Sequence, residues 1–463
     1  MNAPLIWIGF PGITAVVLLL LLDYPRVVKW TGTAAAGVFG LSALIIPVEK
    51  VINLLNYQVA LQNTMNILGR QLIILDSYRP LLVFLFWGYG IWFLLTDFRS
   101  VSPWMIPLGL LSLCIVLIIL TVDPIFYAAI FFAFLALVNT VLLTPPPDPA
   151  VRGVFRYLIY QIFGVLFILF GMWMLSWVDI GSAERVLIIR AVIILGIGFS
   201  FLLAVFPFTS WIPMLAVENH PFLAAFVFHT YLTAVFFLGI RFLAGAAWLP
   251  TVVAIQPALQ FGGLLMVILG GTAAVFSDHM GRTLSSAVIV EIGRALVIIS
   301  FLGEGFQLIY PQLMVQGVSL ALWALCLTVL FPVVKDFRYR SLRGVAKQWP
   351  LIFWGLTAAQ FSLAGLPLLA GFPVYWSATS SLVTLSPERA LIFLGGNLGL
   401  MIAAFRSTNY LVSSSDEENI LILSNLMING LIGLGITGLI IFGLFPQILD
   451  PFVSALANGF RLP

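Results

Sequence analysis

Residues 199–242 read FSFLLAVFPFTSWIPMLAVENHPFLAAFVFHTYLTAVFFLGIRF, a stretch that is apolar enough for a membrane and yet carries three prolines. Pro207 and Pro213 each lack a backbone N–H donor and clash with the preceding helical turn. In lipid, the carbonyls that lose their donors must bond to other protein groups or to water in a cavity. The stretch therefore predicts a membrane helix that is broken here and lines a functional interior.

A second break of the same kind lies in residues 364–373, AGLPLLAGFP. Its interrupting residues are Gly365, Pro367, Gly371 and Pro373. Matched interruptions in the two halves of a polytopic protein indicate discontinuous helices in inverted repeats, an arrangement found in ion-handling membrane proteins. We therefore expect two inverted pseudo-repeats.

The composition is that of an integral membrane protein. The chain has 463 residues, of which 62% are hydrophobic and 8% are charged, whereas soluble domains carry about 25% charged residues. The net charge of +3 is better explained by membrane topology than by nucleic-acid binding. We expect lipid and other membrane proteins as partners, and no nucleic acid. The apolar Met1–Leu22 segment is expected to be the first spanning helix rather than a cleaved leader.

Apolar runs of about 20 residues predict an all-α polytopic membrane protein with about fourteen transmembrane helices, the seventh and twelfth of them broken. The whole chain, residues 1–463, is predicted to form one transmembrane domain. The polar segment Glu49–Arg79 is predicted to lie at the surface, with a short hairpin near Gln71–Leu75. The predicted spans are 4–22, 30–47, 80–96, 103–122, 124–143, 155–177, 186–206, 222–247, 254–276, 282–303, 306–334, 350–370, 389–411 and 420–449, with 208–218 and 371–384 as second halves of the broken helices.

The basic residues predict an exterior N-terminus. With that orientation the cluster Lys335–Lys347 and most other loop cations lie on the cytoplasmic side, as the positive-inside rule requires. Cys114 and Cys326 each stand alone in apolar runs and are expected to fill the core. We find no motif for a metal, a nucleotide or a redox cofactor, so none is expected.

Few ionisable residues fall at membrane depth, where such groups mark functional pathways by default. Glu291 and Arg294 are three residues apart, on one face of a helix. They form either a buried pair that locks helices together or a step of an ion relay. His229, with Thr233 one turn further on, is either a proton shuttle or a core histidine bonded to a carbonyl. Glu304 stands beside glycines at a predicted helix end, where an interfacial position is favoured over a buried one.

Three motifs make the chain resemble the antiporter-like membrane subunits of respiratory complex I, membrane-bound hydrogenases and Mrp cation/proton antiporters. The segment FPFTSWIP at 206–213 is similar to the family's PFHTWLP break, and SLAGLPLLAGF at 362–372 to its SLxGLPxxAGF segment. SDHMGRTLSSAVIVEIG at 277–293 resembles the family's DLKRLLAYSSIxHMG run more loosely. The resemblance covers about residues 100–440 and implies fourteen helices, with breaks in the seventh and twelfth.

The resemblance also implies where ion-translocating residues would stand. The family's fifth-helix glutamate falls at or near Phe132, and its seventh- and eighth-helix lysines fall at Leu202 and Thr233. Its twelfth-helix lysine or glutamate falls at Tyr375. Glu291 takes the place of the tenth-helix histidine. Four positions that are charged in the family are therefore uncharged in this chain. Neighbouring charges that shift each other's pKa values along the family's ion path are absent at these four positions.

Three functional interpretations follow. The first is a divergent subunit of a proton-translocating NAD(P)H:quinone oxidoreductase-type or related complex, with a structural or modulatory role and no redox centre of its own. The second is an active proton/cation or inorganic-carbon-linked transporter, whose path runs through His229, Glu291 and Arg294. The third, a subunit that lines a quinone site, is the least favoured, because the resemblance places quinone chemistry in other subunits. The expected location is a prokaryotic plasma membrane or a thylakoid membrane.

Overall fold

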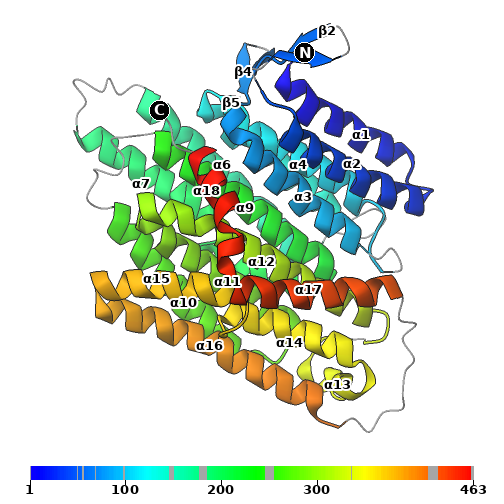
Figure 1. Ribbon diagram of the computed structural model, residues 1–463. Coiled ribbons are helices and arrows are strands. Elements are labelled where there is room, and N and C mark those ends of the chain that lie inside the picture. The colour runs from blue at the N-terminus through cyan, green and yellow to red at the C-terminus, as the bar shows by residue number, and fades with distance from the viewer. Residues whose placement is uncertain are drawn as a thin grey trace.

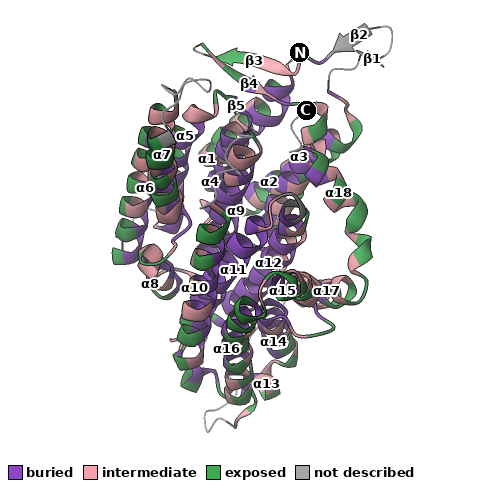
Figure 2. Ribbon diagram, turned by 90° about the vertical axis from the view of Figure 1, so that its left-hand side faces the viewer, coloured by how far each residue is buried: buried purple, intermediate pink, exposed green. Residues whose placement is uncertain are grey.

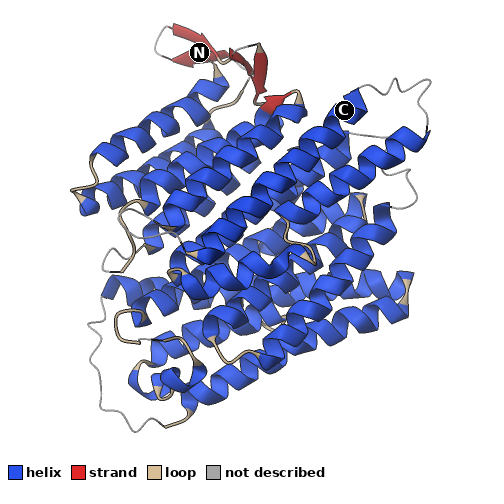
Figure 3. Cartoon of the chain, turned by 180° about the vertical axis from the view of Figure 1, so that it is seen from behind, coloured by secondary structure: helices blue, strands red, loops and turns tan. Residues whose placement is uncertain are grey.

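A computed structural model describes residues 2–48, 51–54, 57–67, 69–96, 100–144, 151–176, 185–245, 255–334, 336–414 and 426–459. Helices make up nearly all of this part of the chain, and strands occur at one end of the bundle (Figure 3). Both ends of the described chain lie near that strand end (Figure 1). The all-α polytopic fold is confirmed.

The helices follow the order of the predicted spans. A π-helical turn at Leu5–Gly9 leads into the first of them. The helices are α1 (Phe10–Leu20), α2 (Pro25–Ile45), α3 (Arg79–Leu95), α4 (Met105–Thr121), α5 (Ala128–Leu143), α6 (Arg152–Ser176), α7 (Arg185–Leu202), α8 (Trp211–Glu218), α9 (Pro221–Gly245), α10 (Ile255–Phe276), α11 (Met280–Ser300), α12 (Gly303–Leu330), α13 (Val345–Gln348), α14 (Pro350–Ala364), α15 (Gly371–Leu385), α16 (Pro387–Val412), α17 (Leu426–Leu444) and α18 (Asp450–Gly459).

Ten helical stretches in the described residues are long and apolar enough to cross a membrane. The shorter apolar helices Leu5–Leu20, Met105–Thr121, Val186–Leu202 and Pro350–Ala364 match the remaining predicted spans. Two of these four stop early because they are the first halves of the broken helices. The total of fourteen spans and the exterior N-terminus stay predictions.

Two series of elements repeat the same order and the same neighbours. In the first series, α4, α5 and α6 precede the broken pair α7–α8, and α9 closes back on α4. In the second, α10, α11 and α12 precede the broken pair α14–α15, and α16 closes back on α10. The break falls at the fourth position of each series, as expected for the two pseudo-repeats.

Both predicted breaks are present, but they are longer than expected, because the first half of each broken helix ends early. The seventh helix ends at Leu202 and the twelfth at Ala364, before the predicted residues 206 and 370. Pro213 and Pro373 do not interrupt a helix: each is the third residue of the second half, α8 or α15. The first N–H groups of a helix have no acceptor within it, so a proline is tolerated there.

The helices α9, α11 and α12 form the buried centre, and α2, α6 and α17 lie on the outside (Figure 2). Glycines bring the backbones of the second series close together. A Cβ atom built on Gly271 of α10 would meet the carbonyl of Gly396 in α16, and Gly263 and Gly293 pack in the same way between α10 and α11. Small residues are typical of contacts between membrane helices. Such helices associate through close van der Waals packing, because the hydrophobic effect does not draw them together in lipid.

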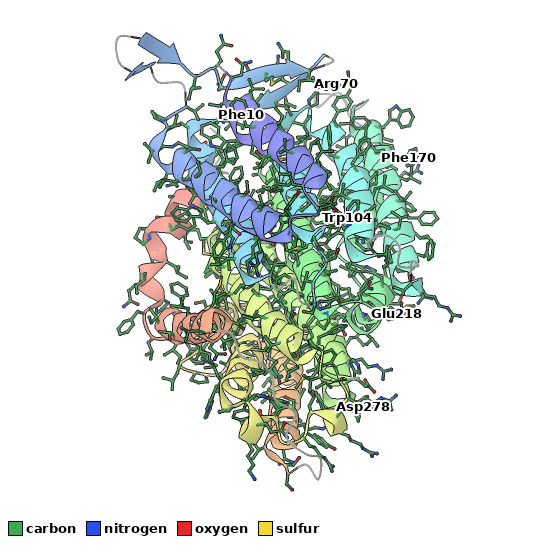
Figure 4. The ribbon with its side chains drawn as sticks, turned by 90° about the vertical axis from the view of Figure 1, so that its right-hand side faces the viewer. Phe10, Arg70, Trp104, Phe170, Glu218 and Asp278 are labelled. Carbon is green, nitrogen blue, oxygen red and sulfur yellow. The ribbon has the colours of Figure 1, made fainter. Side chains whose placement is uncertain are left out.

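The outer face of α6 is aromatic and apolar. Phe170 points away from the bundle (Figure 4), half of its surface is exposed, and its ring stacks 5.8 Å from that of Trp173. Exposed aromatic side chains on a helix of this length suit a face that contacts lipid.

The strand end closes the bundle on one side. β1 (Val51–Leu54) pairs with β2 (Tyr57–Ala60) as one hairpin. A second, formed by β3 (Thr64–Ile67) and β4 (Arg70–Ile73), confirms the hairpin predicted near residue 71. The β4 strand also pairs with β5 (Val122–Asp123). Arg70 marks this end in Figure 4, and Asp278 lies at the opposite end.

Candidate functional site

The candidate site is centred on Glu291 and Arg294, which the structure places together as the sequence predicted. Both side chains project from α11, which is buried on every side, and only 4–5% of either residue is exposed. Arg294 Nη1 donates to Glu291 Oε1 at 2.5 Å. The spacing of three residues puts them one turn apart on the same face, so the pair forms within a single helix.

Arg294 has further partners on two other helices. Nη1 also donates to the main-chain carbonyl of Leu363 at 2.7 Å. Nε donates to Asn397 Oδ1 of α16 at 2.6 Å, and Nη2 bonds to the same oxygen. The amide nitrogen of Asn397 donates to the carbonyl of Phe393 at 2.6 Å, which orients the amide oxygen toward the guanidinium.

The Leu363 carbonyl is available because of the second break. Its helical donor would be the N–H of Pro367, four residues on, and proline has none. The helix ends in a Schellman motif: Leu366 N–H donates to Phe361 O at 2.9 Å and Gly365 N–H to Ser362 O at 3.1 Å, with Gly365 at φ +78°. Arg294 therefore satisfies a carbonyl that the sequence of the break leaves without a donor.

Glu291 is bonded on its second side by α12. Gln312 Nε2 donates to the Glu291 carbonyl at 2.9 Å and to Glu291 Oε2 at 3.2 Å. The pair thus cross-links α11, α12, α14 and α16 across the second break. A buried ion pair is tolerated when its remaining donors and acceptors are satisfied in this way.

A small cavity of about 10 Å³ adjoins the pair; this volume suits about one water molecule. Tyr375 of α15 and Phe393 of α16 form part of its wall, and their rings stack 5.9 Å apart. The Arg294 guanidinium lies 5.6 Å from the centre of the Tyr375 ring, within the range of a cation–π contact. Tyr375 stands where the resemblance puts a charged residue, so the charge here comes from α11 instead.

His229 and Thr233 lie in α9, and no hydrogen bond in the described residues joins them to the pair. The His229 ring stacks 6.2 Å from that of Trp92 in α3, and it abuts Gly317 of α12. His229 Nδ1 and Thr233 Oγ1 are buried without a hydrogen-bond partner in the described part of the chain. Both interpretations of His229, as a proton shuttle or as a core histidine, stay predictions.

The Glu304 side chain lies outside the described residues; its backbone belongs to the first turn of α12. The interfacial position of Glu304 therefore stays a prediction.

The remaining positions from the resemblance are buried in apolar packing. Phe132 contacts the ring of Tyr231 edge-on at 5.8 Å, and Leu202 lies against Gly164. Neither Phe132 nor Leu202 has any exposed surface.

An uncharged polar network runs through the first series. Ser112 Oγ donates to Asn139 Oδ1 at 3.3 Å, and Asn139 Nδ2 donates to the Tyr157 hydroxyl at 3.2 Å. The Tyr231 hydroxyl donates to Gln161 Oε1 at 2.6 Å. These bonds join α4, α5, α6 and α9.

Sequence reasoning missed Tyr157, Tyr231, Gln312 and the Leu363 carbonyl as members of these networks. The proline four residues after Leu363 was a usable signal for that carbonyl. Nothing in the sequence distinguished the two tyrosines from others in apolar runs.

Residues 125–400, from the turn before α5 to within α16, match the family described as NADH:quinone oxidoreductase/Mrp antiporter, TM. The match covers more than half of the chain. The chain belongs to this family. The protein is therefore an integral multi-pass membrane protein, as its composition and its apolar helices predicted.

Two curated relatives support the assignment to the NADH:quinone oxidoreductase/Mrp antiporter family. The chain is 26% identical over 270 residues to NADH-quinone oxidoreductase subunit N of Pelagibacter ubique, covering 56% of this chain and 55% of the relative. It is 29% identical over 260 residues to the subunit N of Cereibacter sphaeroides, covering 53% and 56%. The chain therefore spans about half the length of these curated relatives.

The fold is shared over the whole length with solved structures. A chain of respiratory complex I from Thermus thermophilus has a TM-score of 0.76 at 18% identity, with 97% of this chain and 99% of that chain covered. A chain of the Mrp complex from Dietzia sp. has a TM-score of 0.80 at 14% identity, with 99% and 97% covered. At these identities the likeness describes the fold alone.

Proposed function

We propose that this protein is a membrane subunit of a proton-translocating NADH:quinone oxidoreductase-type or related complex, and that its role there is structural or modulatory. The similarity to subunit N supports the type of complex. The observation that carries the proposed role is the state of the four positions at which the resemblance puts ion-path charges. They are Phe132, Leu202, Thr233 and Tyr375, and none of them carries a charge at neutral pH.

The network around Arg294 supports the same role. A relay group must release and regain a proton or an ion, and this needs a donor or acceptor that can exchange partners. Arg294 instead bonds a carboxylate, a carbonyl and an amide at once, and its charge is effectively permanent. The group is arranged as a lock between helices.

A second function rests on a specific set of polar atoms. Gln316 follows Gln312 by one turn of α12, and the next residue, Gly317, contacts His229. The atoms Gln316 Nε2, Gln312 Oε1 and His229 Nδ1 are buried without a partner in the described residues. This row favours a path from His229 along α12 to Glu291, which is the alternative of an active transporter.

Reconstitution distinguishes the two functions. The full-length protein is purified and placed in liposomes loaded with a pH-sensitive dye, and an Na⁺ or K⁺ gradient is imposed. The proposed role predicts proton flux no higher than in protein-free liposomes. Flux that disappears in His229→Ala or Glu291→Gln, but persists in the exposed-site control Gly37→Ala, would establish the transporter instead.

Association is tested separately. A tagged copy of the protein is purified from its native membrane in a mild detergent, and the bound proteins are identified by mass spectrometry. The proposal predicts stoichiometric recovery of other membrane subunits. Recovery of the protein alone, at full yield and in folded form, would contradict it.

A further inference from the structure

A second cavity, of about 430 Å³, lies between α7, α9, α10 and α11, away from the Glu291–Arg294 pair. Among the described residues that line it, Ser200 has the one polar side chain, and the others are apolar. Ser200 Oγ already donates to the carbonyl of Gly196 at 2.7 Å. The described side chains of the wall therefore offer a polar ligand no free donor, and an apolar occupant fits this part of the cavity.

Glycines leave the space. Gly196, Gly239 and Gly262 line the cavity from three different helices. A Cβ atom built on Gly196 would meet nothing within 4 Å, and on Gly239 or Gly262 it would only reach ordinary contact at 3.8–3.9 Å. These glycines are thus not needed for close helix packing, unlike Gly263 and Gly271 on the same α10 helix. What they do is keep the cavity open.

The cavity opens toward the bilayer on the α7 side. Ile193 and Ile197 line it, and 57% and 37% of their surfaces are exposed. The cavity belongs to the half of the bundle near the strand end, because Arg241, beside its lining residue Phe242, donates to the Val122 carbonyl of β5 at 2.8 Å.

A positive charge stands at the same place on α7. Arg190 is exposed. The spacing of three and four residues places Arg190, Ile193 and Ile197 on the same face of α7. It lies on the strand-end side of the cavity, where the helix approaches the membrane surface. An arginine near a helix end extends its guanidinium to the interface, where lipid phosphates are available.

From this geometry we propose that the cavity is a site for an anionic phospholipid, with one acyl chain between α7, α9, α10 and α11 and the phosphate at Arg190. The volume lies in the range of ligand pockets. A quinone is disfavoured because its carbonyls would find no free side-chain donor among the described residues of the wall. Leu203 and Val205, which belong to the first break, also line the cavity, so the acyl chain packs against the break and supports it.

Native mass spectrometry of the full-length, delipidated protein tests the site. The protein is titrated with palmitoyl-oleoyl phosphatidylglycerol and, in parallel, with the phosphatidylcholine of the same chains. Gly196→Leu, which fills the cavity, should weaken binding of the first phosphatidylglycerol by roughly tenfold. Ala258→Phe, a change at an exposed residue of the rim, should act in the same direction and keeps the test valid if Gly196→Leu does not fold.

The other variants separate headgroup from chain. Arg190→Gln should weaken phosphatidylglycerol binding by about fivefold, to the level of phosphatidylcholine, because one interfacial cation contributes about that much. Gly37→Leu, at an open glycine of α2, should change neither lipid. Equal binding by wild type, Gly196→Leu and Ala258→Phe would overturn the site. A second result would also overturn it: the protein binds ubiquinone-10 but not phosphatidylglycerol, and Gly196→Leu and Ala258→Phe abolish the ubiquinone-10 binding.

Discussion

The guanidinium of Arg294 lies 2.7 Å from the main-chain carbonyl of Leu363, across 69 residues of sequence. Pro367 deprives that carbonyl of its helical donor, and the arginine supplies one. The second break and the buried ion pair are therefore one structural unit, although they look like separate features in the sequence.

Replacing Arg294 by Leu should be more harmful than removing the whole pair. Arg294→Leu leaves the buried Glu291 carboxylate without its counter-ion, which costs about 3–5 kcal/mol of stability. Glu291→Leu/Arg294→Leu removes both charges, but it still leaves the Leu363 carbonyl and Asn397 Oδ1 without donors, at about 1–3 kcal/mol each before relaxation. Thermal unfolding in detergent should rank wild type first, the double variant second and Arg294→Leu last. Equal loss in the two variants would show that the charges are not coupled.

Gly317→Ala should destabilise the protein through His229. A Cβ atom on Gly317 would come within 2.7 Å of His229 Cε1 and Nε2, and overpacking of this kind costs about 1–3 kcal/mol. His229→Ala makes room, so the double variant should regain most of the loss that Gly317→Ala causes.

The control for this cycle is Gly433→Ala on α17, where the added methyl group meets nothing within 4 Å. It should leave the melting temperature unchanged or slightly higher, since alanine favours a helix. Strict additivity of Gly317→Ala and His229→Ala would mean that the two residues do not touch.

Gly365→Ala should loosen the second break. Gly365 has φ +78°, a left-handed conformation that costs an alanine about 1 kcal/mol, and its Cβ would approach the Tyr375 ring to 3.1 Å. We expect a loss of about 1–2 kcal/mol. Gly365→Asn tolerates the same φ better and should lose less in the same unfolding measurement. A smaller loss for alanine than for asparagine would contradict the assigned backbone conformation.

Acid should destabilise the cap of α9. His220 Nδ1 accepts the N–H of Phe222 at 3.2 Å, which requires a neutral ring, and burial lowers the pKa of His220 from 6.5 to about 4. The unfolded chain then binds more protons than the folded protein between these values. Stability is complete above pH 6.5 and falls as the pH drops toward 4, by at most about 3 kcal/mol.

His220→Asn keeps an acceptor at the cap and does not titrate, so it should flatten the slope of melting temperature between pH 6.5 and 4. Part of the slope should persist because of His279, which caps α11 in the same way: its Nδ1 accepts the N–H of Gly281 at 2.9 Å. Burial also lowers the pKa of His279, although the negative charge of Asp336 acts in the opposite direction. An unchanged slope in His220→Asn/His279→Asn would rule out both caps as the origin.

Much of this protein could be predicted from its sequence because the signals are local. Apolar runs separated by polar or proline-rich segments determined the helices, and Pro207, Gly365 and Pro367 determined the breaks, since a proline or a left-handed glycine acts on its own turn of backbone. The spacing of Glu291 and Arg294 was enough to predict their pairing within one helix.

Only the tertiary structure decided what meets the pair. Asn397 is 103 residues from Arg294 and Leu363 is 69, and helical periodicity says which face a residue occupies but not which helix lies opposite. For the same reason the sequence could name His229 as a candidate, but only the fold shows that its ring lies against Trp92 and Gly317. Pro213 and Pro373 looked like breakers until the helix starts two residues before each were known, because the effect of a proline depends on whether its missing N–H would have had an acceptor.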